Sequence, residues 1–531
     1  MRQTHSFAIA CAIMLAAAAI FIQPVIAQPI DRAGYAPSSG GTFTVNTAAD
    51  SDTRQDGAIS LREAVSIANG TLTGPFDAVE RSQLSGCTFT MAGMITNNCG
   101  NGDNLIRFTA TLTQVVLTSS LPVIDRNPIT VDGAVNSGVI MINAQGLVLS
   151  GFRVAADDFT LKNVAVIGTI SHAVRMEGSW KGLEVADSFL GVPPNASGCN
   201  DPRLTFRTGV GVSLVGGSGT GAADDGTAYL HSNVIGCTRF GALSILDALY
   251  VHVGEDKTGA AGRNWIGVTP AGLPISNDEA GIILCCSNLV QGTRVMSNSI
   301  AYNGLNGLQV DASAAANLIQ GNDLHHNQLA GIVIISSSLT SLIDNASHDN
   351  GNSGLWLTEG ASTANTIRGG QYYRNGAAGI TEGQGASLNS WLRVSTYDNA
   401  GLGIDKDDNG APGATGGIVI TSIVQSGGVV TVSGQYNGQV LLATTYHVEL
   451  YRLAPDPTGF GEGRTYLGAY DVQWNLQGDT TWHIRDPRGQ AGCYTALLTV
   501  QDLFGTNSTS YEFSVNFGQW CFDVFLPAVL K

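Results

Sequence analysis

A pattern of asparagine, glycine and aliphatic residues recurs along the middle of the chain, and its first two copies lie in residues 298–332, NSIAYNGLNGLQVDASAAANLIQGNDLHHNQLAGI. In each copy an asparagine is followed four residues later by glycine and then by leucine or isoleucine. The asparagines are spaced by 24, 23, 25 and 24 residues, at Asn303, Asn327, Asn350, Asn375 and Asn399. A repeat of this length, built of short apolar alternations and without a run long enough for a helix, predicts an all-β solenoid of stacked coils.

The repeat also predicts which side chains face the core of the solenoid. Side chains alternate along a strand, so we expect Leu308 and Val310 to point inward and Gln309 to point to solvent. Eight residues before each asparagine stands another residue expected in the core, namely Val295, Ile319, Leu342, Ile367 or Trp391. The glycines suit corners that need a positive φ or a close neighbour. We interpret the asparagine column as structural, with amides that bond from coil to coil.

Composition limits the partners of the chain. Its 531 residues include 67 glycines, and 13% of them are charged, which suits many short strands joined by tight turns. The net charge is −16, from 26 Lys and Arg against 42 Asp and Glu. Nucleic acid is therefore not an expected partner, because phosphate binding needs concentrated basic residues. An acidic polymer is a poor first guess for the same reason.

The N-terminus has the pattern of an export signal. An apolar run spans residues 7–22 and leads to Val25-Ile26-Ala27, so residues 1–27 are predicted to be a cleaved signal peptide. The alternative is a membrane anchor, although the run is shorter than the ~20 residues that span a bilayer. No later segment is long enough to span a membrane, so we expect a secreted, extracellular or cell-surface protein.

Export makes disulfides plausible among the cysteines that remain after cleavage. Proximity favours three pairs, namely Cys87 with Cys99, Cys199 with Cys237, and Cys493 with Cys521. The adjacent Cys285 and Cys286 are expected to be buried or free thiols, with a strained bridge between neighbours as the alternative.

The chain divides into segments of different pattern. We expect a linker over 28–40, a capping module over 41–104 and the β-helix over 105–410, with an excursion at about 193–227. A C-terminal β-sandwich of immunoglobulin-like type follows over 411–517 and a tail over 518–531. In the capping module, Ser60 and Glu63 have capping-box spacing and predict a short amphipathic helix that covers the end of the solenoid.

Three motifs carry a family resemblance. Residues 56–69, DGAISLREAVSIAN, are similar to the CSLREA motif of exported bacterial proteins with right-handed parallel β-helices of the pectin-lyase-like fold, except that Ile59 replaces cysteine. Residues 264–272, NWIGVTPAG, resemble a coil variant of these proteins, and residues 456–463, DPTGFGEG, with Tyr466-Leu467-Gly468 resemble their C-terminal module. The resemblance implies an all-β, right-handed parallel β-helix with a short helical cap and a C-terminal sandwich. It implies no particular activity.

Catalytic signatures are weak. A hydrolase needs paired carboxylates in a groove, and a lyase needs a base beside a group that neutralises a carboxylate. The adjacent acidic pairs Asp157-Asp158, Asp224-Asp225 and Asp407-Asp408 face opposite ways if they lie on strands. Gly-His-Gly and Arg-x-Lys motifs of the polygalacturonase type are missing. We therefore predict no catalytic residues, with a polysaccharide lyase or glycoside hydrolase as the alternative.

A column beside the asparagines is the candidate binding surface. Two residues before each asparagine stand Ala301, His325, His348, Tyr373 and Tyr397. Alternation places these side chains outward, about 4.8 Å apart from coil to coil. Our hypothesis is that the rings of His325, His348, Tyr373 and Tyr397 stack on sugar rings. The alternative is an exposed stack that only stabilises the sheet.

A possible calcium loop follows the last repeat. Asp405, Asp407 and Asn409 with Gly410 resemble the first half of such a loop, in which alternate oxygens converge before a sharp turn. The closing glutamate is missing, because position twelve is Gly416. A solvated polar linker without a cofactor is the alternative.

These features together predict a secreted or cell-surface protein that binds extracellular polysaccharide or acts in adhesion. A structural envelope protein is a further alternative.

Overall fold

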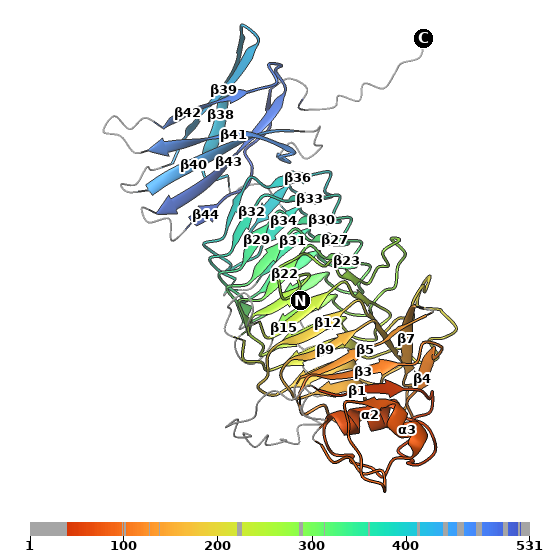
Figure 1. The fold of residues 1–531 in the computed structure, drawn as a ribbon. Helices are drawn as coiled ribbons and strands as arrows, with labels where there is room; N and C mark the ends of the chain where they lie inside the picture. Colours follow the sequence, from red (N-terminus) through yellow and green to blue (C-terminus); the bar gives the residue numbers. More distant parts are fainter. Residues whose placement is uncertain are drawn as a thin grey trace, which may run out of the picture. The chain divides into compact units, whose positions relative to one another are not determined.

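The computed structural model describes residue 40 onward with several gaps (Figure 1). The gaps are residues 98, 100–101, 127, 137, 220–225, 286–289, 313, 359, 361, 411–414, 439–443, 454–460, 474–479, 503–507, 519–520 and 522–531. The predicted signal peptide, the linker up to residue 39, Asp224-Asp225, Cys286 and most of the C-terminal tail therefore lie outside the described residues.

Three long sheets form the solenoid, and each coil adds a strand to them in parallel register. The 13-stranded sheet consists of β2 (Leu84–Ser85), β1 (Thr42–Val45), β3 (Asn104–Phe108), β5 (Ile129–Asp132), β9 (Phe159–Lys162), β12 (Leu183–Ala186), β15 (Ala228–His231), β18 (Val251–Val253), β22 (Arg294–Met296), β26 (Leu318–Gln320), β29 (Ser341–Ile343), β32 (Thr366–Arg368) and β35 (Ser390–Leu392). Only β2, which pairs with β1, is antiparallel here.

The second sheet has 12 strands, β36 (Ser395–Tyr397), β33 (Gln371–Tyr373), β30 (Ala346–His348), β27 (Asp323–His325), β23 (Ser299–Ala301), β19 (Trp265–Ile266), β16 (Val234–Ile235), β13 (Phe189–Leu190), β10 (Val164–Ile167), β7 (Gly138–Asn143), β4 (Gln114–Val116) and the side strand β6 (Ala134–Val135). The third has ten, β37 (Ile404–Lys406), β34 (Ile380–Glu382), β31 (Leu355–Thr358), β28 (Ile332–Ile335), β24 (Leu308–Val310), β20 (Ile282–Cys285), β17 (Leu243–Leu246), β14 (Val210–Val215), β11 (His172–Glu177) and β8 (Ser150–Val154). A small separate pair joins β21 (Val290–Gln291) to β25 (Ala314–Ala315).

The predicted core residues lie in the core. Val295, Ile319, Leu342, Ile367 and Trp391 are fully buried, as are Leu308 and Val310. Gln309, which we expected in solvent, is buried instead. Its amide oxygen accepts from Asn306 and its amide nitrogen donates to Asp311, and its register partners Ile283 and Val333 are also buried. The outer face of the ten-stranded sheet is thus partly apolar at this level.

The first end of the solenoid is covered by two helices, α2 (Leu61–Ala68) and α3 (Ala78–Ser82). The capping box predicted at Ser60 is present, and Ile59 is fully buried where the resembled motif has cysteine. Arg62 is not merely solvated, because its guanidinium forms a 2.8 Å ion pair with the buried carboxylate of Asp50. Strand β1, just before the helices, pairs in parallel with β3 and so begins the stack.

Three predicted disulfides are present, Cys87–Cys99, Cys199–Cys237 and Cys493–Cys521. The expectation of a free thiol at Cys285 is wrong, since this cysteine is also disulfide-bonded. The segment over 193–227, predicted to leave the coil, contains a regular strand of the solenoid. This strand is β14, which pairs in parallel with β11 and β17.

The C-terminal residues form two antiparallel sheets around a separate apolar core. One contains β38 (Ile418–Ser426), β39 (Val429–Tyr436) and β42 (Thr481–Asp486); the other contains β41 (Thr465–Gln473), β40 (Thr444–Arg452), β43 (Cys493–Asp502), β44 (Ser508–Ser510) and β45 (Phe517–Gly518). Strand β44 ends at Ser510, and residues 511–514 continue the chain outside a regular strand.

Carboxylates of this sandwich bind backbone amides of the last coil, where another coil would otherwise supply carbonyl acceptors. Glu449 accepts from the N–H of Arg393, and Glu512 from the N–H of Lys406. Glu462 accepts from the N–H groups of Asp398 and Asn399. The sandwich therefore protects the open sheet edges of the solenoid.

Within the described part of the chain, no helix is long and apolar enough to cross a membrane.

Candidate functional site

The asparagines of the repeat form the ladder that the sequence predicts. Each side-chain amide donates to the amide oxygen of the next coil, at 2.8 Å from Asn303 to Asn327, 2.9 Å to Asn350, 3.1 Å to Asn375 and 3.0 Å to Asn399. All but Asn399 are buried. These bonds satisfy polar groups that face the core, so the asparagines are structural.

A second ladder was missed from the sequence. Asn233, Asn264, Asn298, Asn322 and Asn345 bond in the same way at 2.9–3.1 Å. The signal was available, because Asn298, Asn322 and Asn345 each stand five residues before an asparagine of the first ladder.

The repeated glycines are required because the backbone of the next coil lies too close for a side chain, and not because φ is positive. A Cβ on Gly307 would lie 2.6 Å from the carbonyl oxygen of Gly331. Positive φ occurs one residue before each ladder asparagine, at Tyr302, His326, Asp349, Arg374 and Asp398. This left-handed residue makes the corner and turns the next side chain inward.

The outward column next to the ladder is continuous, and we call it the aromatic column: His325, His348, Tyr373 and Tyr397. Its ring centroids are 5.2, 4.6 and 4.7 Å apart along the column, with planes within 12° of parallel. The strands β27, β30, β33 and β36 hold these residues in direct register. The predicted outward direction and coil spacing of the column are therefore confirmed.

Stacking leaves the edges of these rings facing solvent, not their faces. Each inner ring has a neighbour on both faces, and Arg464 covers the end of the column with its guanidinium 4.8 Å from the centre of Tyr397. The idea that sugars stack on the ring faces is therefore wrong for this arrangement. Imidazole and hydroxyl groups at the edges can exchange hydrogen bonds with a ligand.

Charged groups flank the column at its middle. His348 lies 3.0 Å from Asp323 and 2.6 Å from Asp349, and Asp349 also binds Arg374 through both carboxylate oxygens. Burial alone would lower the pKa of His348, but the two carboxylates raise it. The hydrogen bond from Arg374 leads the causes that hold the pKa of Asp349 well below its usual range. Burial lowers the pKa of His325, which has no carboxylate hydrogen bond.

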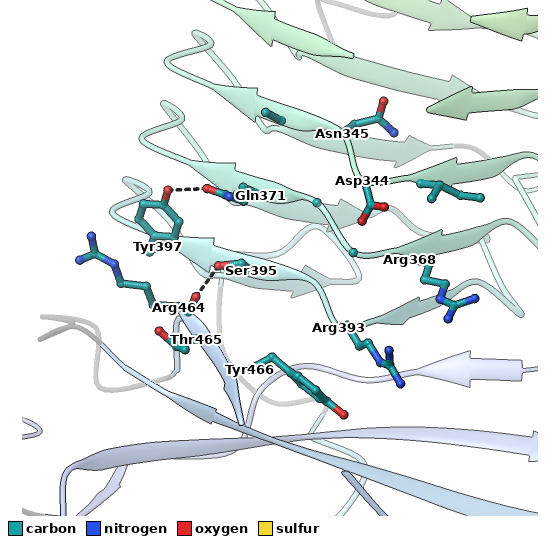
Figure 2. Close-up of a pocket in the computed structure, with 14 residues that line it drawn as sticks. Asp344, Asn345, Arg368, Gln371, Arg393, Ser395, Tyr397, Arg464, Thr465 and Tyr466 are labelled. Atoms are coloured by element: carbon teal, nitrogen blue, oxygen red, sulfur yellow. Dashed lines mark hydrogen bonds between the residues drawn. The ribbon is translucent and has the colours of Figure 1, made fainter. Parts of the chain in front are cut away.

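At its C-terminal end the aromatic column borders a pocket of about 860 Å³ (Figure 2). We call it the arginine pocket, because Arg368, Arg393 and Arg464 line it together with Tyr397, Tyr466 and Asp344. Successive coils contribute Arg368 and Arg393, and the sandwich contributes Arg464 and Tyr466. Ser395 donates a 2.5 Å hydrogen bond to the carbonyl oxygen of Arg464 and so holds one wall to the other. No sequence motif marks this pocket, because its lining residues are spread along the chain from Ile343 to Tyr466.

A second polar cluster lies on the outer face of the 13-stranded sheet, in a cavity of about 420 Å³. The ring of His252 stacks on the buried Tyr229 at 5.0 Å and contacts Glu255 at 3.3 Å. Arg294 binds both oxygens of Glu255, at 2.9 and 3.0 Å. Burial lowers the pKa of His252. Sequence reasoning missed this cluster, because its members come from three coils and carry no local motif.

The possible calcium loop is closed by hydrogen bonds instead. The carboxylate of Asp405 accepts from the backbone N–H groups of Asn409 and Gly410, at 3.3 and 3.1 Å. Burial raises the pKa of Asp405. Among the described residues, no group of three or more His, Cys, Asp or Glu side chains is placed to hold a metal ion.

Comparison with known proteins identifies the solenoid. Residues 275–420 match the family model described as "Right handed beta helix region". The solenoid is a right-handed parallel β-helix. The coils outside the matched range continue the same sheets, so the β-helix extends well beyond it toward the N-terminus. No curated protein matches the chain.

Several solved structures resemble the β-helix at low sequence identity. The A-module of mannuronan C-5 epimerase AlgE4 from Azotobacter vinelandii is 14% identical, with a TM-score of 0.38, covering 59% of this chain and 84% of that one. The periplasmic alginate epimerase AlgG is 12% identical, with a TM-score of 0.32, covering 56% and 77%. The enzymatically active domain of tailspike protein 2 of bacteriophage CBA120 is 11% identical, with a TM-score of 0.33, covering 78% and 72%. Likeness at this level carries no argument about function.

Proposed function

We propose that this protein is a secreted or cell-surface polysaccharide-binding protein, and that a glycan chain lies along the aromatic column. The observation that carries the proposal is the unbroken run of four rings, each 4.6–5.2 Å from the next. The row presents a ring edge at each of four successive coils, two imidazoles followed by two phenols, which suits an extended ligand. The three disulfides accord with an exported protein.

The edges, rather than the faces, make the contacts in this proposal. The tyrosine hydroxyls and Nε2 of His325 hydrogen-bond to sugar hydroxyls, while the stack holds the rings rigid. Both nitrogens of His348 are bound to Asp323 and Asp349. A rigid row loses little conformational entropy on binding, because its side chains are already ordered by one another.

The test compares two double variants in a polysaccharide pull-down and on a glycan array. Tyr373→Ala with Tyr397→Ala removes rings and hydroxyls, and we expect retention to fall about tenfold, since about 1.4 kcal/mol corresponds to that factor. Tyr373→Phe with Tyr397→Phe keeps the stack but removes the hydroxyls, and we expect a loss of severalfold. Tyr470→Ala, a change of the same kind on the sandwich strand β41, is the matched control.

Unchanged retention of the alanine variant, with its melting temperature intact, would remove the column from the binding surface. Full retention by the phenylalanine variant alone would instead assign binding to apolar contact with the rings.

The second candidate function is catalysis at the His252 cluster. One observation favours it. The half-exposed Arg294 and His252, whose pKa is lowered, both contact the buried carboxylate of Glu255 in a cavity. A neutral imidazole is able to accept a proton, as the general base of a polysaccharide lyase does, and Arg294 holds Glu255 beside it through two hydrogen bonds.

This candidate is tested by incubating the full chain with polysaccharides and measuring unsaturated products and reducing ends. His252→Asn and Arg294→Gln are expected to abolish any activity found, while Arg485→Gln on the sandwich leaves it unchanged. Activity that survives both changes would exclude the cluster.

A further inference from the structure

The arginine pocket contains positive charge that the rest of the structure does not neutralise. Several other arginines of the coils are paired, as Arg374 is with Asp349 and Arg294 with Glu255. Within the described residues, Arg368, Arg393 and Arg464 form no ion pair, and Asp344 is the only carboxylate lining the pocket. The side chains that line the pocket thus include three cations and one carboxylate, and Glu449 binds the backbone N–H of Arg393 from outside this lining.

Aromatic rings orient two of these guanidinium groups. Arg464 lies over Tyr397 at 4.8 Å and Arg393 lies over Tyr466 at 5.6 Å. Contact with a ring occupies the flat face of a guanidinium and leaves its N–H edges free. Those edges match the paired oxygens of a carboxylate or a sulfate. Figure 2 shows Arg368 and Arg393 reaching out on the same side from successive coils, while Arg464 lies beside Tyr397.

We propose that the arginine pocket binds an acidic group of a polysaccharide, a carboxylate or a sulfate ester, at the end of the aromatic column. The inference deepens the proposed function and rests on it, because Tyr397 belongs to both the column and the pocket. A glycan that runs along the column meets Arg464 beside Tyr397, and Arg368 and Arg393 line the opposite side of the pocket. The volume of about 860 Å³ lies in the range of small-molecule sites, about 300–1,000 Å³, and holds a short stretch of sugar.

The net charge of −16 argued against an acidic ligand, but the local arrangement outweighs it. At physiological salt, charges more than about 8 Å away are largely screened, so the groups beside the ligand decide its binding. Asp349 is held by His348 and Arg374, and Glu462 is buried against backbone amides. Asp349 is thus paired with basic side chains and Glu462 is stabilised by backbone N–H groups before a ligand arrives.

The experiment uses the full chain and three polymers with one backbone: dextran, carboxymethyl-dextran and dextran sulfate. We expect the wild type to bind at least one acidic polymer more tightly than dextran, with a preference that weakens as salt rises. The two acidic polymers distinguish a carboxylate from a sulfate ester.

Variants locate the effect. We expect acidic-polymer binding to weaken roughly fivefold in each of three variants, Arg368→Gln, Arg393→Gln and Arg464→Gln. Arg464→Lys should bind better than Arg464→Gln, because lysine keeps the positive charge but lacks the paired N–H groups of a guanidinium. Arg485→Gln, an exposed arginine on the sandwich, is the matched control.

The outcomes separate the two proposals. If the arginine variants bind acidic polymers as the wild type does, the inference is overturned, whether or not the tyrosine variants lose binding. If the tyrosine variants alone weaken binding to all polymers, the aromatic column stands without the acidic site. If the wild type binds none of the polymers and nothing on the glycan array, both proposals fail.

Discussion

Replacing Asn350 by alanine should destabilise the middle of the β-helix more than any surface change. Its amide donates to the amide oxygen of Asn375 at 3.1 Å and to the carbonyl of Leu324 at 3.2 Å. Its own oxygen accepts from the side chain and the backbone N–H of Asn327, at 2.9 and 3.1 Å. Alanine removes all four bonds and leaves the backbone N–H of Asn327 without this acceptor, while Asn375 still accepts from the backbone N–H of residue 350 and the Asn327 amide still donates to Ile300.

The cost follows from those lost bonds. A buried polar group without a partner costs about 1–3 kcal/mol, and water entering the vacated space relieves part of this. We therefore expect a loss of about 3–5 kcal/mol for Asn350→Ala. Asn352→Ala is the control, because Asn352 is half-buried and its side chain accepts only from the neighbouring Ser353 among the hydrogen bonds of the described residues. It should cost under about 1 kcal/mol.

Guanidinium denaturation followed by far-UV circular dichroism measures the loss. Stacked repeats need not unfold in one step, so hydrogen exchange of the Asn327 and Asn375 coils should accompany it. Equal midpoints for the two variants, or unchanged protection in both neighbouring coils, would refute the idea that the ladder stabilises the stack.

Three shorter predictions concern titration and metal binding. Burial raises the pKa of Glu63 to about 7, so the fold loses stability as pH rises from the usual glutamate range toward 7. Glu63→Gln should therefore gain about 1–2 kcal/mol relative to the wild type between pH 5 and 8; a difference that stays constant with pH would contradict this. Because the pKa of His348 is raised, the stability it contributes is present at low pH and is lost as pH climbs through its folded value. His348→Gln should thus be less stable than wild type at pH 5.5 by up to about 1 kcal/mol and closer to it at pH 8.5, and the opposite trend would exclude the carboxylate contacts as the cause. For calcium we expect EDTA to leave the melting temperature unchanged, because backbone amides already occupy the carboxylate of Asp405; a clear drop would assign the metal to Asp405, Asp407 and Asn409.

The sequence predicted those parts of the structure that depend on repetition. The asparagine spacing predicted the solenoid, the first ladder and the outward direction of His325 and Tyr397, because coil position fixes side-chain direction. It did not predict that the rings would stack face to face, since that depends on their rotamers. Gln309 was misplaced for a similar reason, because its burial depends on the register partners in the coils on either side.

Sites built from distant segments could not be predicted. The arginine pocket joins Arg368 to Tyr466, and the His252 cluster joins Tyr229 to Arg294 across three coils. No local motif marks either arrangement. The Glu-Gly pair at 462–463 was noticed only as part of a resemblance, whereas its contacts with Asn399 and Thr396 give it a physical role.

The glutamate at the end of the ladder has a consequence for how such a protein changes in length. The side chain of every asparagine in the ladder both donates and accepts a hydrogen bond. The carboxylate of Glu462 only accepts, from the side-chain amide of Asn399 at 3.0 Å. Glu462, which binds the last asparagine of the ladder, thus belongs to the sandwich. Its contact with Asn399 does not depend on the number of coils before it. A coil of 23 to 25 residues is therefore an interchangeable unit. Duplicating or deleting one between Asn327 and Asn375 would lengthen or shorten the surface on which the aromatic column lies and leave both ends chemically unchanged.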